Sequence, residues 1–140
     1  MLNPSCTVTY HVSDPALKKR IRADLANWHA CIPDWVRDLH VTHTPVDEER
    51  PITAAQVEVN YAYWKLSLTV HDRYFLKSDK ERRAYFIHEM LHAHIAPLTE
   101  HYGVVENEHG MDPALVTLAV NVEERSVESI TYMIRDLLGR

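Results

Sequence analysis

Two histidines and a glutamate in the stretch FIHEMLHAHIAP, residues 86–97, have the types and spacing of a zinc site. His88 and His92 are four residues apart, so on a helix their imidazoles lie on one face, about one turn apart. Glu89 lies about 100° around the helix axis from His88, where it can reach a metal-activated water more easily than the metal. The pattern therefore predicts a zinc ion (Zn2+) bound by His88 and His92, with Glu89 as the general base.

The HExxH pattern is rare by chance, because shuffling a chain of this composition produces it roughly 0.05 times. Its surroundings also fit a helix with one buried face. A capping box formed by Ser78 and Glu81 is expected to begin this helix, and Pro97 is expected to break it. The apolar residues of the helix are Tyr85, Ile87, Met90, Leu91 and Ile95.

A catalytic zinc ion usually has three protein ligands, so a third ligand must come from elsewhere in the chain. The metzincin pattern is excluded, because Ile95 and Leu98 stand where its glycine and third histidine would be. The remaining candidates are His109 and an acidic pair, Glu123 and Glu124. Helical periodicity places Glu123 at the middle of the buried face of a C-terminal helix and Glu124 at the edge of that face.

The rest of the chain predicts an α+β fold that would position these residues. Alternating and β-branched residues predict strands over residues 6–12, 35–42, 57–61 and 66–70, the last two as an antiparallel pair bent near Ala62. A helix is expected to begin at Asp14 and Pro15 and to end by Pro33. A last helix is expected over residues 114–138, with Gly139 as its C-cap.

The expected architecture is a single domain over residues 1–140. In it a small antiparallel or mixed sheet of three to four strands packs on the HExxH helix and on the C-terminal helix.

Charge and composition exclude several kinds of partner. The net charge of -5 repels a phosphate backbone, so nucleic acid is not expected as a partner. No signal peptide and no run of 18 apolar residues is found, which predicts a cytoplasmic protein with no membrane contact. Two cysteines, Cys6 and Cys31, are too few for a disulfide framework and are expected to be reduced, buried thiols.

The segment HEMLH, followed some thirty residues later by a glutamate on a second helix, resembles the gluzincin arrangement of zinc metallopeptidases. The likeness is to the compact, single-domain forms of phages and mobile elements, and it covers roughly residues 57–138. It implies a zincin-like fold, in a phage or its bacterial host. In that family the third ligand is followed by a small apolar residue three positions on and an acidic residue four positions on.

Glu124, with Val127 and Glu128 after it, matches this motif except that the family has Asp where Glu128 stands. The resemblance therefore implies Glu124 as the third ligand and Glu128 as the support of a ligand histidine.

A second resemblance gives the alternative ligand. HEMLHAH followed by the pair His109 and Gly110 is similar to Spartan-type proteases, which would make His109 the third ligand and DNA-linked proteins the substrate. The acidic charge and the missing basic or cysteine-rich tail argue against this alternative.

The predicted function is that of a zinc metalloendopeptidase acting on a protein or peptide substrate. An edge strand, expected at Leu66 to Val70, would hold the substrate by backbone pairing. The donor that stabilises the oxyanion stays open among His101, Tyr102, His109 and Tyr132. A non-catalytic zinc-bearing regulatory or binding module is the alternative class, and Glu89→Gln separates the two.

Overall fold

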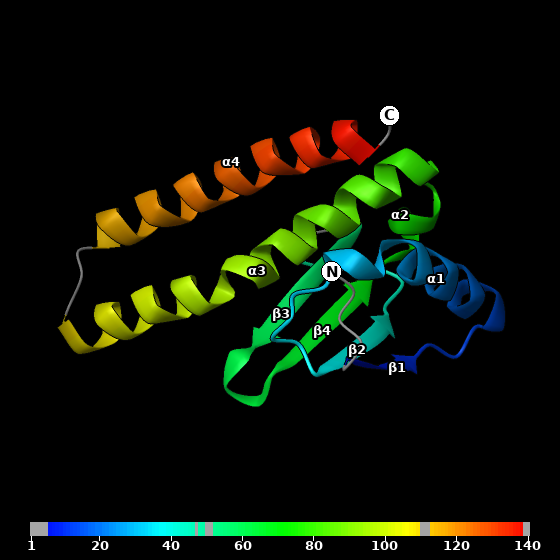
Figure 1. Ribbon diagram of the computed structural model, residues 1–140, viewed down its shortest axis with the longest axis horizontal. Helices are drawn as coiled ribbons and strands as arrows, with labels where there is room; N and C mark the ends of the chain where they lie inside the picture. The colour runs from blue at the N-terminus through cyan, green and yellow to red at the C-terminus, as the bar shows by residue number, and fades with distance from the viewer. Residues whose placement is uncertain (1–5, 47, 50–51, 110–112, 139–140) are drawn as a thin grey trace.

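The computed structural model describes the backbone of residues 6–46, 48–49, 52–109 and 113–138. Side chains are described in these ranges except at residues 98–109, 113, 115, 116, 135, 137 and 138. The fold is α+β, as predicted, with one four-stranded mixed sheet and four α-helices in this part of the chain (Figure 1).

The sheet has the order β1-β2-β4-β3, so β3 is at one edge. Its strands are β1 (Thr7–His11), β2 (Asp38–His43), β3 (Ala55–Asn60) and β4 (Lys65–Val70). β1 and β4 both pair with β2 in parallel, whereas β3 and β4 form the predicted antiparallel pair. All four strands lie within or close to the segments that alternation predicted.

One face of the sheet is apolar and carries the core. Alternate residues of β2 and β4 are fully buried, among them Leu39, Val41, Leu66 and Val70. The residues between them, such as Ser67 and Thr69, face the opposite side and stay partly exposed. The helices therefore cover the first face and leave the second, polar face open.

Helix α1 (Pro15–Trp28) connects the parallel strands β1 and β2. Asp14 caps it as predicted, because the Asp14 carboxylate accepts hydrogen bonds from the N–H groups of Ala16 at 2.9 Å and Leu17 at 3.3 Å. The α1 residues Ile21 and Leu25 are buried in the core. A short helix, α2 (Asp72–Phe75), was not predicted, since four residues give no helical period to detect.

Helix α3 (Asp79–His109) contains the HExxH motif and begins as predicted. Ser78 N–H donates to Glu81 Oε2 at 2.8 Å, and Glu81 N–H donates to Ser78 Oγ at 3.3 Å, which is the reciprocal pattern of a capping box. The helix lies against the sheet with Phe86, Met90 and Ala93 buried.

The prediction that Pro97 breaks this helix is wrong, because α3 continues through Pro97 to His109. Proline cannot donate to the carbonyl four residues earlier, so Ala93 C=O loses its helical partner. The indole Nε1 of Trp35 donates to that carbonyl at 3.0 Å. Trp35 thus supplies the missing donor, and the helix tolerates the proline for this reason.

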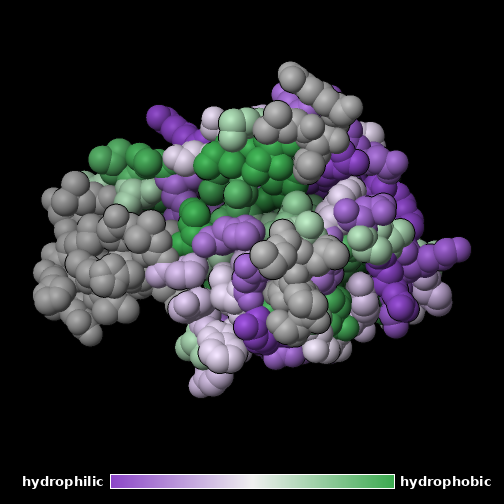
Figure 2. All heavy atoms as spheres, in the orientation of Figure 1, coloured by the Kyte–Doolittle hydropathy of each residue, from purple (hydrophilic) through white to green (hydrophobic). Residues whose placement is uncertain are grey.

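Helix α4 (Pro113–Leu138) forms as predicted, but the prediction that it packs on the sheet is wrong: it packs antiparallel on the side of α3 away from the sheet (Figure 1). The predicted C-cap, Gly139, lies outside the described residues. Val127 is buried between the helices, whereas Ile130 is 39% exposed. Figure 2 shows apolar surface along α4, where Leu118, Val122 and Met133 are also exposed.

A buried ionic group holds the start of α3 to the rest of the domain. Arg82 Nε donates to Asp24 Oδ2 at 3.0 Å, and Tyr74 Oη donates to the same oxygen at 2.7 Å. Arg82 also donates to the Lys77 carbonyl at 2.8 Å. Burial and the Asp24 carboxylate raise the pKa of Tyr74, so the phenol stays protonated. The group therefore connects α1, α2 and α3.

We expect Asp24→Ala to lower the free energy of unfolding by about 3–5 kcal/mol, because it leaves the Arg82 charge buried without its partner. A double variant, Asp24→Leu with Arg82→Met, should be less destabilised than Asp24→Ala, since it removes both charges. Urea unfolding followed by circular dichroism measures both values. Equal stability of Asp24→Ala and the wild type would contradict this role.

Candidate metal centre

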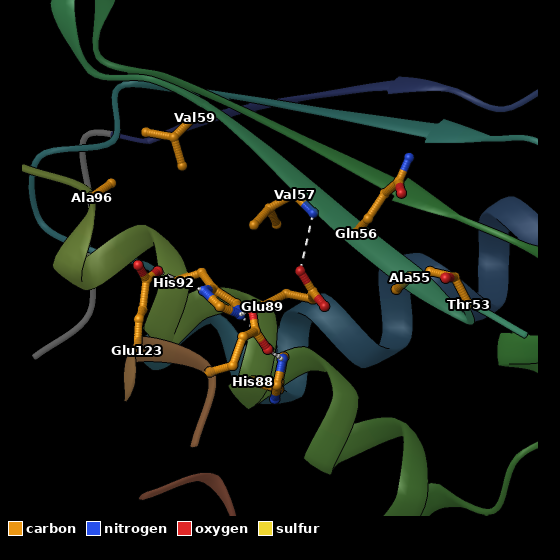
Figure 3. Close-up of a pocket in the computed structure, with 11 residues that line it drawn as sticks. Thr53, Ala55, Gln56, Val57, Val59, His88, Glu89, His92, Ala96 and Glu123 are labelled. Carbon is orange, nitrogen blue, oxygen red and sulfur yellow. Dashed lines mark hydrogen bonds and ion pairs between the residues drawn. The ribbon is translucent and has the colours of Figure 1, made fainter. Parts of the chain in front are cut away.

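The two histidines of the HExxH motif lie on one face of α3, as their spacing predicted. Phe86, Met90 and Ala93 take the opposite, core-facing side, so His88 and His92 are only partly buried. The Nε2 atoms of His88 and His92 are 3.2 Å apart. Figure 3 shows both side chains beside the cavity next to β3. The short distance between the two Nε2 atoms means that two imidazole nitrogens converge on one point.

Glu124 approaches the same point from α4. Its carboxylate oxygens lie 3.2 Å from His92 Nε2 and 3.8 Å from His88 Nε2. One possible ligand atom from each of the three residues lies within 4.8 Å of the other two. The structure therefore brings together the two histidines and the carboxylate that the sequence selected as third ligand.

Glu123 has a different partner from Glu124. Its Oε1 lies 3.1 Å from His92 Nδ1, the ring nitrogen that points away from the His88 imidazole. The Glu123 side chain is 26% exposed and that of Glu124 is 55% exposed. Both glutamates therefore lie at the site, with Glu124 beside the converging nitrogens and Glu123 placed to orient His92.

The contacts of Glu128 differ from the histidine-supporting contact that the resemblance implied. Tyr132 Oη donates to Glu128 Oε1 at 3.5 Å. Glu123 lies within hydrogen-bond distance of His92 Nδ1, whereas Glu128 affects the motif through its charge, which opposes the lowering of the His88 pKa. Sequence reasoning missed this role of Glu123, because a helical period reports the face of a residue and not the atom it contacts.

Glu89 points toward the sheet and away from the two histidine rings. Its Oε2 accepts a hydrogen bond from Val57 N–H of β3 at 3.1 Å (Figure 3). The pKa of Glu89 is raised to about 8, mainly by burial; the Val57 N–H opposes this shift and the Glu124 charge adds to it. Glu89 is thus a fixed and partly buried carboxyl group whose protonation changes near neutral pH.

His88 is favoured in its neutral form, which is the form that binds metals. Burial lowers the pKa of His88, and the neighbouring His92 lowers it further, while Glu124 and Glu128 oppose this shift. A neutral imidazole has one nitrogen lone pair available, and here two such nitrogens face a carboxylate.

A cavity of about 490 Å³ lies between α3, α4 and β3 and contains these groups. The prediction that residues Leu66 to Val70 form the edge strand is wrong, because β4 pairs with β2 and with β3. The edge strand is β3. The N–H group of its residue Val57 points away from β4 and donates to Glu89. In an antiparallel strand every second residue points the same way, so Ala55 and Val59 also direct their backbone groups outward.

The other sequence candidates lie elsewhere or outside the described side chains. The backbone of His101, Tyr102 and His109 belongs to α3, but their side chains are outside the described part. Cys6 and Cys31 are free, as expected, but are only half-buried. Burial raises the pKa of both thiols.

Comparison of the chain with protein-family models, with curated proteins and with solved structures finds no match. In the described part of the chain, no helix is both long and apolar enough to cross a membrane.

The different positions of Glu123 and Glu124 predict different effects on zinc affinity. Glu123→Gln should weaken zinc binding about 10-fold, because it removes the charge that orients His92. Glu124→Gln should weaken binding more than Glu123→Gln, since it removes a candidate ligand oxygen. Calorimetric titration of zinc into metal-free protein measures both. Glu58→Gln is the control, because Glu58 is an exposed β3 carboxylate that does not line the cavity.

Equal affinity of Glu124→Gln and the wild type would contradict the assignment of Glu124. A larger loss of zinc affinity in Glu123→Gln than in Glu124→Gln would instead make Glu123 the ligand and Glu124 the residue that orients His92.

Proposed function

We propose that this protein is a zinc-dependent metallopeptidase of the zincin type, with His88, His92 and Glu124 as zinc ligands and Glu89 as general base. One observation carries the proposal: two imidazole nitrogens and a carboxylate converge within 4.8 Å beside a partly buried glutamate. The cavity that holds them runs along the exposed edge of β3.

The residues present fit a catalytic zinc ion. Zinc binds imidazole nitrogen and carboxylate oxygen, and catalytic sites use three protein ligands so that one position stays open. Two histidines and one glutamate are such a set, and Glu123 on His92 Nδ1 provides the outer support that metal-binding histidines usually have. When bound, zinc would lower the pKa of water and polarise a substrate carbonyl.

Glu89 would move the proton in this reaction. Its carboxylate accepts a proton from the attacking water, whose oxygen bonds to the peptide carbonyl carbon. The C–N bond then breaks, and the proton passes from Glu89 to the leaving amine nitrogen. Glu89 must be ionised to accept the proton, and a cation held by the three ligands would favour that ionised form.

The edge of β3 would hold the substrate in extended form. Backbone groups of Ala55 and Val59 point outward on either side of Val57, and Val57 N–H fixes Glu89 between them. A peptide that pairs with this edge therefore passes Glu89 and the two histidines. Protein segments able to extend into a strand are the substrate class that this geometry favours.

Glu89→Gln tests the catalytic part of the proposal. The amide oxygen keeps the Val57 hydrogen bond but cannot accept the water proton, so zinc should stay bound while hydrolysis falls by about 10²–10⁴-fold. Zinc content is measured by mass spectrometry and hydrolysis with a quenched fluorescent peptide mixture. His88→Ala is the matched variant, and it should lose zinc and hydrolysis together.

A zinc-loaded wild type that cleaves no peptide, or a Glu89→Gln protein as active as the wild type, would contradict the peptidase assignment. The first result would favour a zinc-bearing binding module.

A further inference from the structure

A second cavity, of about 580 Å³, adjoins the candidate metal centre at the start of β3. It shares Thr53, Ala55, His88 and Glu89 with the first cavity, and Figure 3 shows Thr53 and Ala55 on the β3 side and His88 and Glu89 on α3. The two cavities therefore form one groove that passes His88 and Glu89. A chain bound at Glu89 along β3 would place neighbouring side chains in both cavities.

Each of the two helices gives the second cavity a carboxylate and a phenol ring. Glu81 and Tyr85 are four residues apart on α3, and Glu128 and Tyr132 are four residues apart on α4. The two pairs lie on the helix faces that line the cavity. Ile52, before β3, and Ala84 of α3 add apolar wall. The cavity is therefore acidic at some points and apolar or aromatic at others.

The charges of this cavity are suited to a cation. Glu81 and Glu128 give it two carboxylates, and its described lining residues include no lysine or arginine. Hydrogen bonds from Ser78 lower the pKa of Glu81, which keeps that carboxylate charged. Lys77 lies beside the cavity with its Nζ 5.9 Å from the centre of the Tyr85 ring. The chain's own ammonium group thus already contacts one face of the Tyr85 ring, and a substrate cation would have to compete with Lys77 there.

The direction of β3 indicates which substrate residue reaches the second cavity. β3 runs from Ala55, which lines both cavities, to Val59, which lines only the first. A peptide that pairs antiparallel with β3 runs the opposite way, so its chain passes Glu89 and then enters the second cavity. The residue after the scissile bond is therefore the one whose side chain lies there.

We propose that the second cavity binds the side chain of a lysine or arginine that follows the scissile bond, with its charge near Glu128 and Glu81. The proposal rests on the peptidase function proposed above. The long apolar stem of such a side chain fits against Tyr85 and Tyr132, and its charged end reaches the carboxylates. The two helices would thus select the substrate as well as hold the metal.

Cleavage-site sequencing is the first test. Zinc-loaded protein is incubated with a denatured protein mixture, and the new amino termini are identified by mass spectrometry. Lysine and arginine should be enriched about five-fold at the first position after the cut, and Glu128→Gln should reduce this enrichment. Glu58→Gln, which makes the same charge change outside both cavities, should leave it unchanged. Cuts without this enrichment would overturn the proposal.

Binding without cleavage is the second test. Glu89→Gln protein is titrated with two peptides that differ only in lysine or norleucine at the proposed position. The lysine peptide should bind about five-fold more tightly, and adding Glu128→Gln should remove most of the difference. Equal binding of the two peptides by Glu89→Gln protein would overturn the proposal.

The two tests separate failure of the cavity from failure of the proposed function. Peptide cleavage without a preference for lysine or arginine after the cut would reject the proposed role of the second cavity and leave the peptidase assignment intact. A clear lysine preference in binding, in a protein that hydrolyses no peptide when zinc is bound, would support the cavity and reject the peptidase assignment.

Discussion

The site depends on the close approach of three glutamate side chains to two imidazole rings. Glu89, Glu123 and Glu124 line one cavity, and its described lining residues include no lysine or arginine. The pKa of Glu89 is raised to about 8, mainly by burial, so this part of the cavity disfavours an additional negative charge. The Glu124 charge disfavours the ionised form of Glu89, and a bound cation would relieve that repulsion. A divalent cation at the converging nitrogens would therefore stabilise the whole arrangement.

Three contacts fix α3 so that its polar face meets both β3 and α4. Asp24 holds Arg82 at the start of the helix, Trp35 bonds the Ala93 carbonyl at its middle, and Val57 N–H binds Glu89 between them. α4 lies on the outer side of α3 with Val127 buried, and this packing brings Glu123 and Glu124 to His92. The β3 edge beside Glu89 stays uncovered by another strand, so the groove is open to an extended chain.

The sequence predicted where the helices and strands lie, but only part of the contacts between them. Alternation and capping residues located the four strands, α1, the start of α3 and α4, because these signals are local. The prediction at Pro97 was wrong because Trp35 supplies the hydrogen-bond donor that the proline lacks. Trp35 lies more than sixty positions earlier, so no local signal reveals this contact. The strand edge was also misassigned, because only the pairing order decides which of two alternating segments is outermost. Spacing identified Glu123 and Glu124 as a pair but could not divide their roles, which depend on the rotation of α4 against α3.

The most direct test of this account is a crystal structure of the zinc-loaded protein, measured at wavelengths on both sides of the zinc absorption edge. The account predicts one anomalous peak at about 2.0–2.2 Å from His88 Nε2, His92 Nε2 and a Glu124 oxygen, with Glu123 on His92 Nδ1. Zinc bound elsewhere, for example at the stacked pair of His11 and His40, with none between the two helices, would contradict it.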